Sequence, residues 1–339
     1  MKKRKWMILS WMILFVGMVT LAFGVPSPAL LGEAEEEYMD SFFEEDLFED
    51  WEEENISTSG IGYGSSNDSA GSLAFEEGVI SILPFDFSAG MVPKEENYTE
   101  NTYKDSTISV TMKTEKIEDT VYHTAHVKIA HPAQLRTALA APFGAKKTNK
   151  VSTMAKENNA IVAINGDYYI QRSGYIVRQS EVYRTKVLKD LDNLLIDENG
   201  DFHLIKGGDT KGMKELTESG IKIINSFTFG PAMIIDGEIQ EKPKEYRFNI
   251  KRNEPRAALG QIGPLEYLFV VADGRSDASK GVSTDTLGEY MHGLGCQQAF
   301  NLDGGNSATL IFHNDYYSTK SEKAERSISD IIYFATAEN

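Results

Sequence analysis

The chain has 339 residues, of which 41% are apolar, and a single cysteine, Cys296. This apolar content suffices for the core of a domain of roughly 200 residues or more, whereas one cysteine excludes an intramolecular disulfide and a multi-cysteine zinc site. The net charge is -17, but 13 carboxylates and no Lys or Arg fall between Glu33 and Glu54, so the rest is only mildly acidic. No basic block follows the first five residues, which argues against nucleic-acid binding.

The N-terminus has the pattern of a membrane anchor. A basic head at residues 1–5 precedes Trp6 to Val25, twenty residues without charge, and a helix of that length crosses the ~30 Å hydrocarbon core. The basic head should stay in the cytoplasm. The alternative is a cleaved signal peptide, because residues 22–24 and 27–29 resemble small-residue cleavage sites. Both interpretations export the rest of the chain.

Residues 26–97 have the composition of a linker. The acidic stretch also contains aromatic side chains, and repulsion between its carboxylates predicts an extended, solvated spacer, with a docking peptide for a partner as the alternative. Residues 55–72 are rich in Gly and Ser, which is typical of a flexible coil. We expect the folded domain to cover residues 98–339.

This domain is predicted to be mainly β-structure. Short runs of β-branched and aromatic residues, bounded by Gly, Asn and Asp, predict strands at 107–112, 121–130, 160–164, 194–197, 202–205, 221–224, 232–235, 267–272, 299–302, 308–312 and 331–334. Residues 197–200 and 236–237 predict hairpin turns, because Asn and Gly tolerate positive φ. Antiparallel pairing should therefore dominate.

Two helices are expected, at 148–158 and 283–294. The second has a capping residue, Ser283, and apolar residues with the i, i+3, i+4, i+7 spacing of one helical face. A largely antiparallel, mixed β-sheet core with a few covering helices places the domain in the α+β class.

Three predicted strands end in a polar turn that contains glycine. These turns are Asn165-Gly166-Asp167, Asp273-Gly274-Arg275, and the stretch from Asn301 through Asp303-Gly304-Gly305-Asn306-Ser307. Polar side chains at the ends of buried strands are well placed to face a ligand, and glycine allows backbone to approach it closely. The successive amides of Asp303-Gly304-Gly305 also suit an anion-binding nest.

With Gly230-Pro231-Ala232, the run from Glu254 to Gly260, and Gly295-Cys296, these segments resemble the phosphodiester glycosidase family. The resemblance extends from about Ala133 to the C-terminus, and bacterial members are often labelled exopolysaccharide biosynthesis proteins. The chain has Asn306 where the family usually has a third glycine, so the substrate of a relative should not be assumed.

The resemblance implies hydrolysis of a sugar 1-phosphodiester, which builds oxocarbenium character on the sugar and negative charge on the departing phosphate. Asp303 is then the predicted nucleophile or base, and Asp273 the second carboxylate. Arg256 and Arg275 suit the phosphate, because a guanidinium fork fits two phosphate oxygens. The other predicted substrate-binding residues are Asn165, Gly166, Asp167, Asn301, Gly304, Gly305, Asn306 and Ser307, of which Asn165, Asn301 and Ser307 suit sugar hydroxyls.

Each candidate also has a structural alternative. Arg275 can pair with Asp277, Asp167 can cap a turn, and Asn301 can satisfy buried backbone. No cofactor is firmly expected, although a divalent cation between Asp273, Asp303 and a substrate phosphate is left open.

Other metal and nucleophile sites are disfavoured. His123 and His126 should point to opposite faces of one strand, which argues against a shared metal, and Cys296 has the setting of a small buried residue.

The sequence therefore predicts a membrane-anchored extracytoplasmic hydrolase whose substrate is a carbohydrate phosphodiester of cell-wall or exported polysaccharide. The alternative is a non-catalytic glycan-binding or scaffold protein of exopolysaccharide assembly. Protein partners are not indicated.

Overall fold

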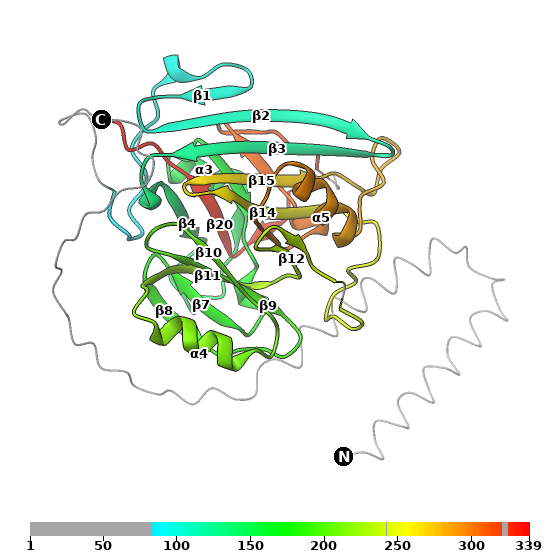
Figure 1. The fold of residues 1–339 in the computed structure, drawn as a ribbon. Coiled ribbons are helices and arrows are strands. Elements are labelled where there is room, and N and C mark those ends of the chain that lie inside the picture. The colour runs from blue at the N-terminus through cyan, green and yellow to red at the C-terminus, as the bar shows by residue number, and fades with distance from the viewer. Residues whose placement is uncertain (1–82, 242, 321–324) are drawn as a thin grey trace, which may run out of the picture. The chain divides into compact units, whose positions relative to one another are not determined.

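The computed structural model describes residues 83–241, 243–320 and 325–339 (Figure 1). All of them belong to one compact unit, 68–339. The predicted head, membrane span and most of the linker lie outside the described residues. Within these ranges, no helix has both the length and the apolar character needed to cross a membrane.

The largest sheet has eight strands, and every neighbouring pair is antiparallel. Their spatial order is β1 (Thr102–Lys104), β2 (Ile108–Ile117), β3 (Thr120–Ile129), β15 (Glu266–Ala272), β14 (Arg256–Gly263), β16 (Gln298–Asn301), β12 (Ala232–Ile235) and β13 (Glu238–Ile239).

Smaller antiparallel sheets complete the domain. A five-stranded sheet has the order β18 (Asp315–Tyr316), β17 (Leu310–Phe312), β6 (Val162–Asn165), β20 (Asp330–Phe334) and β4 (Leu135–Leu139). A three-stranded sheet has the order β10 (Phe202–Ile205), β9 (Asp192–Asp197) and β11 (Ile223–Phe229). The two-stranded pairs are β7 (Tyr175–Arg178) with β8 (Glu181–Thr185), and β5 (Asn149–Lys150) with β19 (Ser327–Ile328).

Helices are few and short. The α-helices are α3 (Val151–Glu157), α4 (Thr210–Glu218) and α5 (Thr284–Gly293), and the 3₁₀ turns are η1 (Glu95–Asn97), η2 (Pro132–Gln134), η3 (Tyr169–Gln171) and η4 (Gly305–Ser307).

The main core contains residues of the eight-, five- and three-stranded sheets, such as Phe269 of β15, Phe334 of β20 and Phe227 of β11. The opposite face of β15 packs against α5, where Leu268 and Val270 share a second cluster with Leu287 and Met291. Strand β15 is therefore buried on both faces, which explains its unbroken apolar sequence. Figure 1 shows α5 lying beside β14 and β15.

The structure confirms the α+β class and the antiparallel pairing. Ser283 caps α5 by accepting a hydrogen bond from the Thr286 amide. Both predicted hairpin turns are present, and Asp236 and Gly237 have φ values of 52° and 79°, as the tight turn between β12 and β13 requires. The predicted strand 221–224 overlaps only the first two residues of β11, which begins at Ile223 and continues to Phe229.

Residues 83–97, assigned from sequence to the linker, contact the domain. The fully buried Arg136 of β4 donates hydrogen bonds to the backbone carbonyls of Pro84, Asp86 and Ser88. Leu83 packs in the cluster that covers the outer side of the five-stranded sheet. Gly90 also forms hydrogen bonds with Asn158 and Asn159, and Lys94 forms an ion pair with Glu338, so contacts along the described segment attach it to the domain.

Candidate active site

Asp303 lies shortly after β16, and only one of its two carboxylate oxygens contacts another described residue. The residue is 7% exposed, and its Oδ1 lies 3.4 Å from Arg172 Nη2. Its Oδ2 is buried and has no hydrogen-bond partner among the described residues. Leaving a buried acceptor without a partner typically costs about 1–3 kcal/mol. Ordered water or a ligand satisfies such an atom, so this carboxylate is a candidate for substrate contact.

Within the part of the chain that the structure describes, two more buried polar atoms near Asp303 lack partners. They are Asn301 Oδ1 and Ser307 Oγ, and both residues are 1% exposed. The other end of the Asn301 amide donates to the Gly230 carbonyl at 2.7 Å. The Asn301 amide group thus satisfies a buried backbone carbonyl, which is the structural role considered for it from the sequence. Its side-chain oxygen remains available to a ligand. The stretch from Asn301 to Ser307 offers a ligand one carboxylate, one amide oxygen and one hydroxyl.

Asn165, at the end of β6, fixes the backbone of this stretch. Its Nδ2 donates to the Asp303 carbonyl at 2.7 Å, and its Oδ1 accepts from the Thr309 amide at 3.1 Å. Both ends of the side chain are therefore engaged. These contacts make Asn165 a positioning residue rather than one with a free group for a sugar hydroxyl.

The two glycines after Asp303 lie against backbone. A Cβ on Gly304 would come within 2.7 Å of the Pro255 carbonyl oxygen, and the Gly305 amide donates to that same oxygen at 2.8 Å. Glycine is required here because another chain segment passes close by. The Gly305 amide is consequently engaged within the protein, so the expected nest cannot use it for an anion in this conformation.

Asp273, predicted as the second carboxylate, has both oxygens engaged. Oδ2 lies 2.8 Å from His123 Nε2, and Oδ1 accepts from the Thr319 amide at 3.2 Å. The other ring nitrogen of His123 lies 2.9 Å from Thr114 Oγ1. His126 contacts Glu266 instead. The described residues contain no cluster of His, Cys, Asp and Glu suited to a metal.

Arg275 lies at the rim of the Asp303 turn. Its Nε donates to Glu254 Oε2 at 2.7 Å and its Nη1 to Asn306 Oδ1 at 3.0 Å. Its ion-pair partner is thus Glu254 and not Asp277, whose carboxylate lies by Lys280. Asn306, the departure from the family pattern, therefore orients an arginine beside Gly305.

Arg256 is turned toward protein backbone. The residue is 6% exposed, and it donates to the carbonyls of Val282, Asn249 and Arg252 at 2.8–3.1 Å. Burial lowers its pKa to about 10. This arginine ties the loop before β14 to the segment before α5, and its predicted phosphate contact is untested.

Arg256→Lys is expected to lower the free energy of unfolding by about 1–3 kcal/mol, because an ammonium group cannot reach three carbonyls from one position. Urea denaturation of the full chain measures this. A variant with wild-type stability and reduced turnover would instead return Arg256 to the substrate site.

Asp167 belongs to a buried ionic cluster, and Gly166 lies against it. Arg178 Nη2 lies 2.8 Å from both Asp167 Oδ1 and Asp330 Oδ2, and all three side chains are at most 1% exposed. Burial raises the pKa of Asp167 to about 6, against the opposing effect of Arg178. Gly166 leaves room for the Asp330 carboxylate. Asp167 therefore pairs with an arginine rather than capping a turn.

Sequence reasoning missed Arg172, which contacts Asp303. It directly follows η3, five residues after Asp167, and its Cζ lies 4.6 Å from the Phe248 ring centre and 5.2 Å from that of Phe229. The sequence signal for Arg172 was a basic residue shortly after the polar turn that follows β6. The two phenylalanines that hold its guanidinium come from distant segments, so the sequence did not indicate its position.

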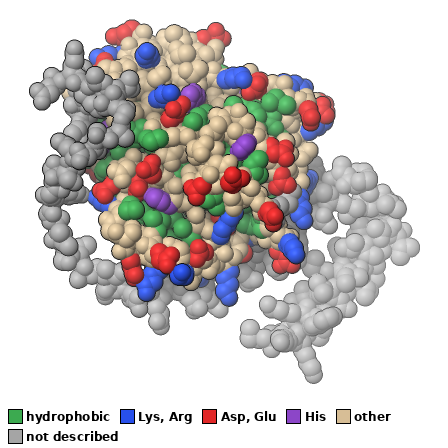
Figure 2. Space-filling model, viewed as in Figure 1, with side chains coloured by type: hydrophobic (Ala, Val, Ile, Leu, Met, Phe, Trp, Pro, Cys, Tyr) green, Lys and Arg blue, Asp and Glu red, His purple; other side chains and the backbone are tan. Residues whose placement is uncertain are grey.

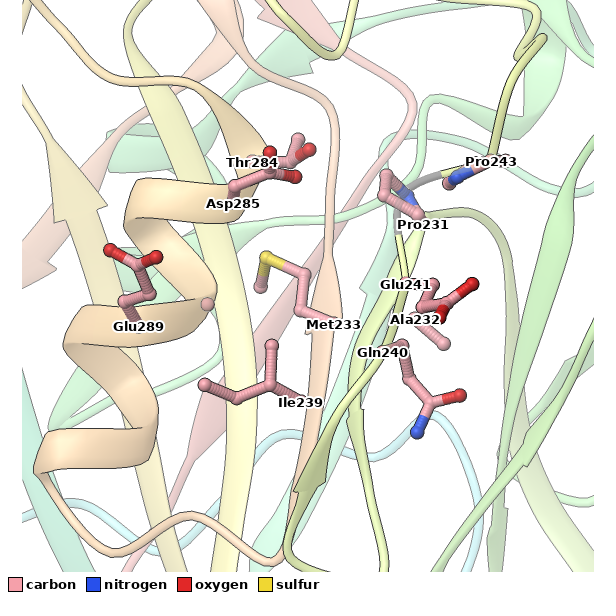
Figure 3. A pocket seen from close by; sticks show the side chains of 11 residues that line it. Pro231, Ala232, Met233, Ile239, Gln240, Glu241, Pro243, Thr284, Asp285 and Glu289 are labelled. Atoms are coloured by element: carbon pink, nitrogen blue, oxygen red, sulfur yellow. The ribbon is translucent and has the colours of Figure 1, made fainter.

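A separate pocket lies between β12 and α5 (Figure 3). Its floor includes Met233 and Ile239, and its acidic lining residues are Glu241, Asp285 and Glu289, with no Lys or Arg among the lining residues. An anionic phosphodiester would be repelled there. The candidate active site is therefore the Asp303 turn and not this pocket.

Acidic and basic side chains are interspersed on the face in Figure 2. That face shows no continuous basic stripe of the kind that follows a phosphate backbone.

Comparison with known proteins identifies the family. The family model for phosphodiester glycosidases matches residues 158–335. The catalytic domain of zebrafish N-acetylglucosamine-1-phosphodiester alpha-N-acetylglucosaminidase, auto-inhibited by its pro-peptide, is similar in fold, with a TM-score of 0.57 and 18% identity over 72% of this chain and 86% of that one. A hypothetical protein from Synechocystis has a TM-score of 0.48 at 14% identity, covering 69% of this chain and 64% of that one.

A curated relative is the SPbeta prophage-derived uncharacterized protein YomE of Bacillus subtilis (strain 168), which is 27% identical over 197 residues. The match covers 56% of this chain but only 30% of the relative's length. The family match includes β6, the Arg178 cluster, β14 to β16 and the Asp303 turn. This chain belongs to the phosphodiester glycosidase family.

Proposed function

We propose that this protein is an extracytoplasmic hydrolase that cleaves sugar 1-phosphodiester linkages in cell-wall or exported polysaccharide. Family membership supports the reaction type. The uncharged run from Trp6 to Val25 behind a basic head supports the location. The polysaccharide context rests on the labels of bacterial relatives.

The observation that carries this proposal is the buried, unpartnered Oδ2 of Asp303 beside an arginine. Cleavage at the anomeric carbon needs a carboxylate to attack or stabilise the oxocarbenium-like centre. It also needs a cation to neutralise the phosphate that leaves. The Asp303 turn supplies the carboxylate and the segment after η3 supplies Arg172, and the two groups lie 3.4 Å apart.

The surrounding groups suit the two halves of such a substrate. Asn301 Oδ1 and Ser307 Oγ are the buried polar atoms suited to sugar hydroxyls. A phosphodiester is already a good leaving group, so a strong general acid is less important than in ordinary glycosidases. This agrees with Asp273, whose oxygens are both engaged.

The test is hydrolysis of the methyl phosphodiesters of α- and β-N-acetylglucosamine and glucose by the full-length chain, in water enriched in ¹⁸O. We expect release of free sugar and methyl phosphate without ¹⁸O, because water should attack the anomeric carbon. Label in the methyl phosphate would show P–O cleavage and contradict a glycosidase. Binding without turnover of any of the four compounds would favour a glycan-binding protein.

A further inference from the structure

We propose that Arg172 is the guanidinium that receives the substrate phosphate, and that Asp303 is its counter-ion only in the absence of substrate. The inference rests on the proposed function. The phosphate takes the N–H groups of Arg172, and Asp303 is released to face the anomeric carbon. Arg172 thereby makes the site selective for phosphodiesters.

The contact between the two side chains is weak enough to be exchanged. Arg172 Nη2 and Asp303 Oδ1 are 3.4 Å apart, whereas charge-assisted hydrogen bonds usually measure about 2.7–2.9 Å. Arg172 Nε is buried and has no partner among the described residues, as is true of Asp303 Oδ2. Each member of the pair therefore keeps unused hydrogen-bonding capacity inside the site.

Two aromatic rings hold the guanidinium in place. Phe229 and Phe248 stack on each other with centroids 4.4 Å apart, and Arg172 Cζ lies within 5.2 Å of both. Aromatic faces attract a guanidinium while leaving its N–H edges for a planar anion. Arg184 also donates to the Arg172 carbonyl at 2.6 Å, which fixes the local backbone.

Neighbouring arginines donate to protein groups, although Nε of Arg178 and Nε of Arg184 lack a partner among the described residues, as does Nε of Arg172. Arg178 binds two buried carboxylates, and the terminal nitrogen of Arg184 donates to two carbonyls. Arg256 donates to three carbonyls, and Arg275 to Glu254 and Asn306. Of these five arginines, Arg172 is the one that contacts Asp303. Its ion-pair distance is longer than those of Arg178 and Arg275.

This arrangement explains selectivity by simple competition. A phosphodiester brings an anion that replaces Asp303 as the partner of Arg172. An ordinary glycoside has no such group, so its binding would leave the carboxylate paired and less reactive. The charge on the leaving group thus decides whether the nucleophile is free.

The experiment measures binding of inorganic phosphate to the full-length chain by calorimetry, together with steady-state hydrolysis of the sugar methyl phosphodiester that the wild type cleaves. The variants are Arg172→Gln and Arg172→Lys. The matched control is Arg247→Gln, which removes a charge next to Phe248 from an arginine that pairs with the exposed Asp190. Thermal melting verifies folding, and Arg172→Lys keeps the stem and charge if Arg172→Gln does not fold.

We expect phosphate affinity to fall at least tenfold in Arg172→Gln, less in Arg172→Lys, and not in Arg247→Gln. Asp303→Asn should bind phosphate at least as tightly as the wild type, because a competing anion is removed. Arg172→Gln affinity within twofold of wild type, or no phosphate binding by wild type, would overturn the inference.

The two proposals can fail separately. Arg172-dependent phosphate binding in a chain that cleaves no sugar phosphodiester would retain the phosphate site and remove the hydrolase. Turnover that Arg172→Gln leaves unchanged would retain the hydrolase and remove Arg172.

Discussion

Asp303→Asn should reduce kcat on a sugar 1-phosphodiester by roughly 100-fold or more, the range seen when a transition-state electrostatic contact is lost. The substitution keeps size and hydrogen bonding but removes the charge that an oxocarbenium-like centre requires. Substrate binding should be kept or strengthened, because repulsion between Asp303 and the phosphate disappears. Initial rates over a range of substrate concentrations separate kcat from KM.

The matched control is Asp277→Asn, in which an exposed carboxylate paired with Lys280 loses the same charge. Its kcat should equal that of the wild type. Near-normal turnover by a folded Asp303→Asn protein would show that Asp303 serves to form the turn and not to catalyse the reaction, since asparagine is well tolerated in such turns.

Arg178→Met should destabilise the fold by about 3–5 kcal/mol, because it leaves two buried carboxylates without their cation. Asp167 and Asp330 both pair with this arginine, whose side chain is fully buried. Arg178 also donates to the Ser226 carbonyl of β11. The cluster therefore joins β7, β11, β20 and the turn after β6, and urea denaturation of the full chain measures its loss.

Arg247→Met is the matched control, since its partly exposed pair with Asp190 should contribute only about 0–1 kcal/mol. The cluster also bears on activity, because Asn165 precedes Gly166 and Asp167 and holds the Asp303 carbonyl. If Arg178→Met lowers the free energy of unfolding by less than about 1 kcal/mol, the charges of Asp167 and Asp330 are neutralised without Arg178.

Strands with a strong local pattern were predictable from sequence. Strand β15 is apolar from Tyr267 to Ala272 because both of its faces are buried there, and β10 and β12 have the predicted bounds. Strand β14 was missed although it lies at the centre of the large sheet. A Cβ on its Gly260 would lie 2.6 Å from Cys296 Sγ and 2.8 Å from Met291 Cε, so this strand needs small residues, which lower its β-propensity.

Helix α4 was missed for a different reason. Only Met213 is buried, and much of the helix surface carries ion pairs such as Lys211 with Glu215. The helix has nine residues, fewer than the roughly 11–18 over which a helical period is recognised in a sequence. The cap by Asp209 was the one local feature that could have indicated it.

The candidate site was likewise predictable from the sequence only in part. Local pattern was enough to locate the turn of Asp303 and its neighbours Asn301 and Ser307, because a polar, glycine-containing turn after a buried strand is a feature of consecutive residues. Which arginine contacts the Asp303 carboxylate depends on distant partners. Arg256 is taken up by carbonyls near residues 249 and 282, whereas Arg172 is held by two phenylalanines from elsewhere in the chain. A guanidinium has five donors on a long stem, so its partner is decided only when the packed fold brings acceptors and aromatic faces within reach.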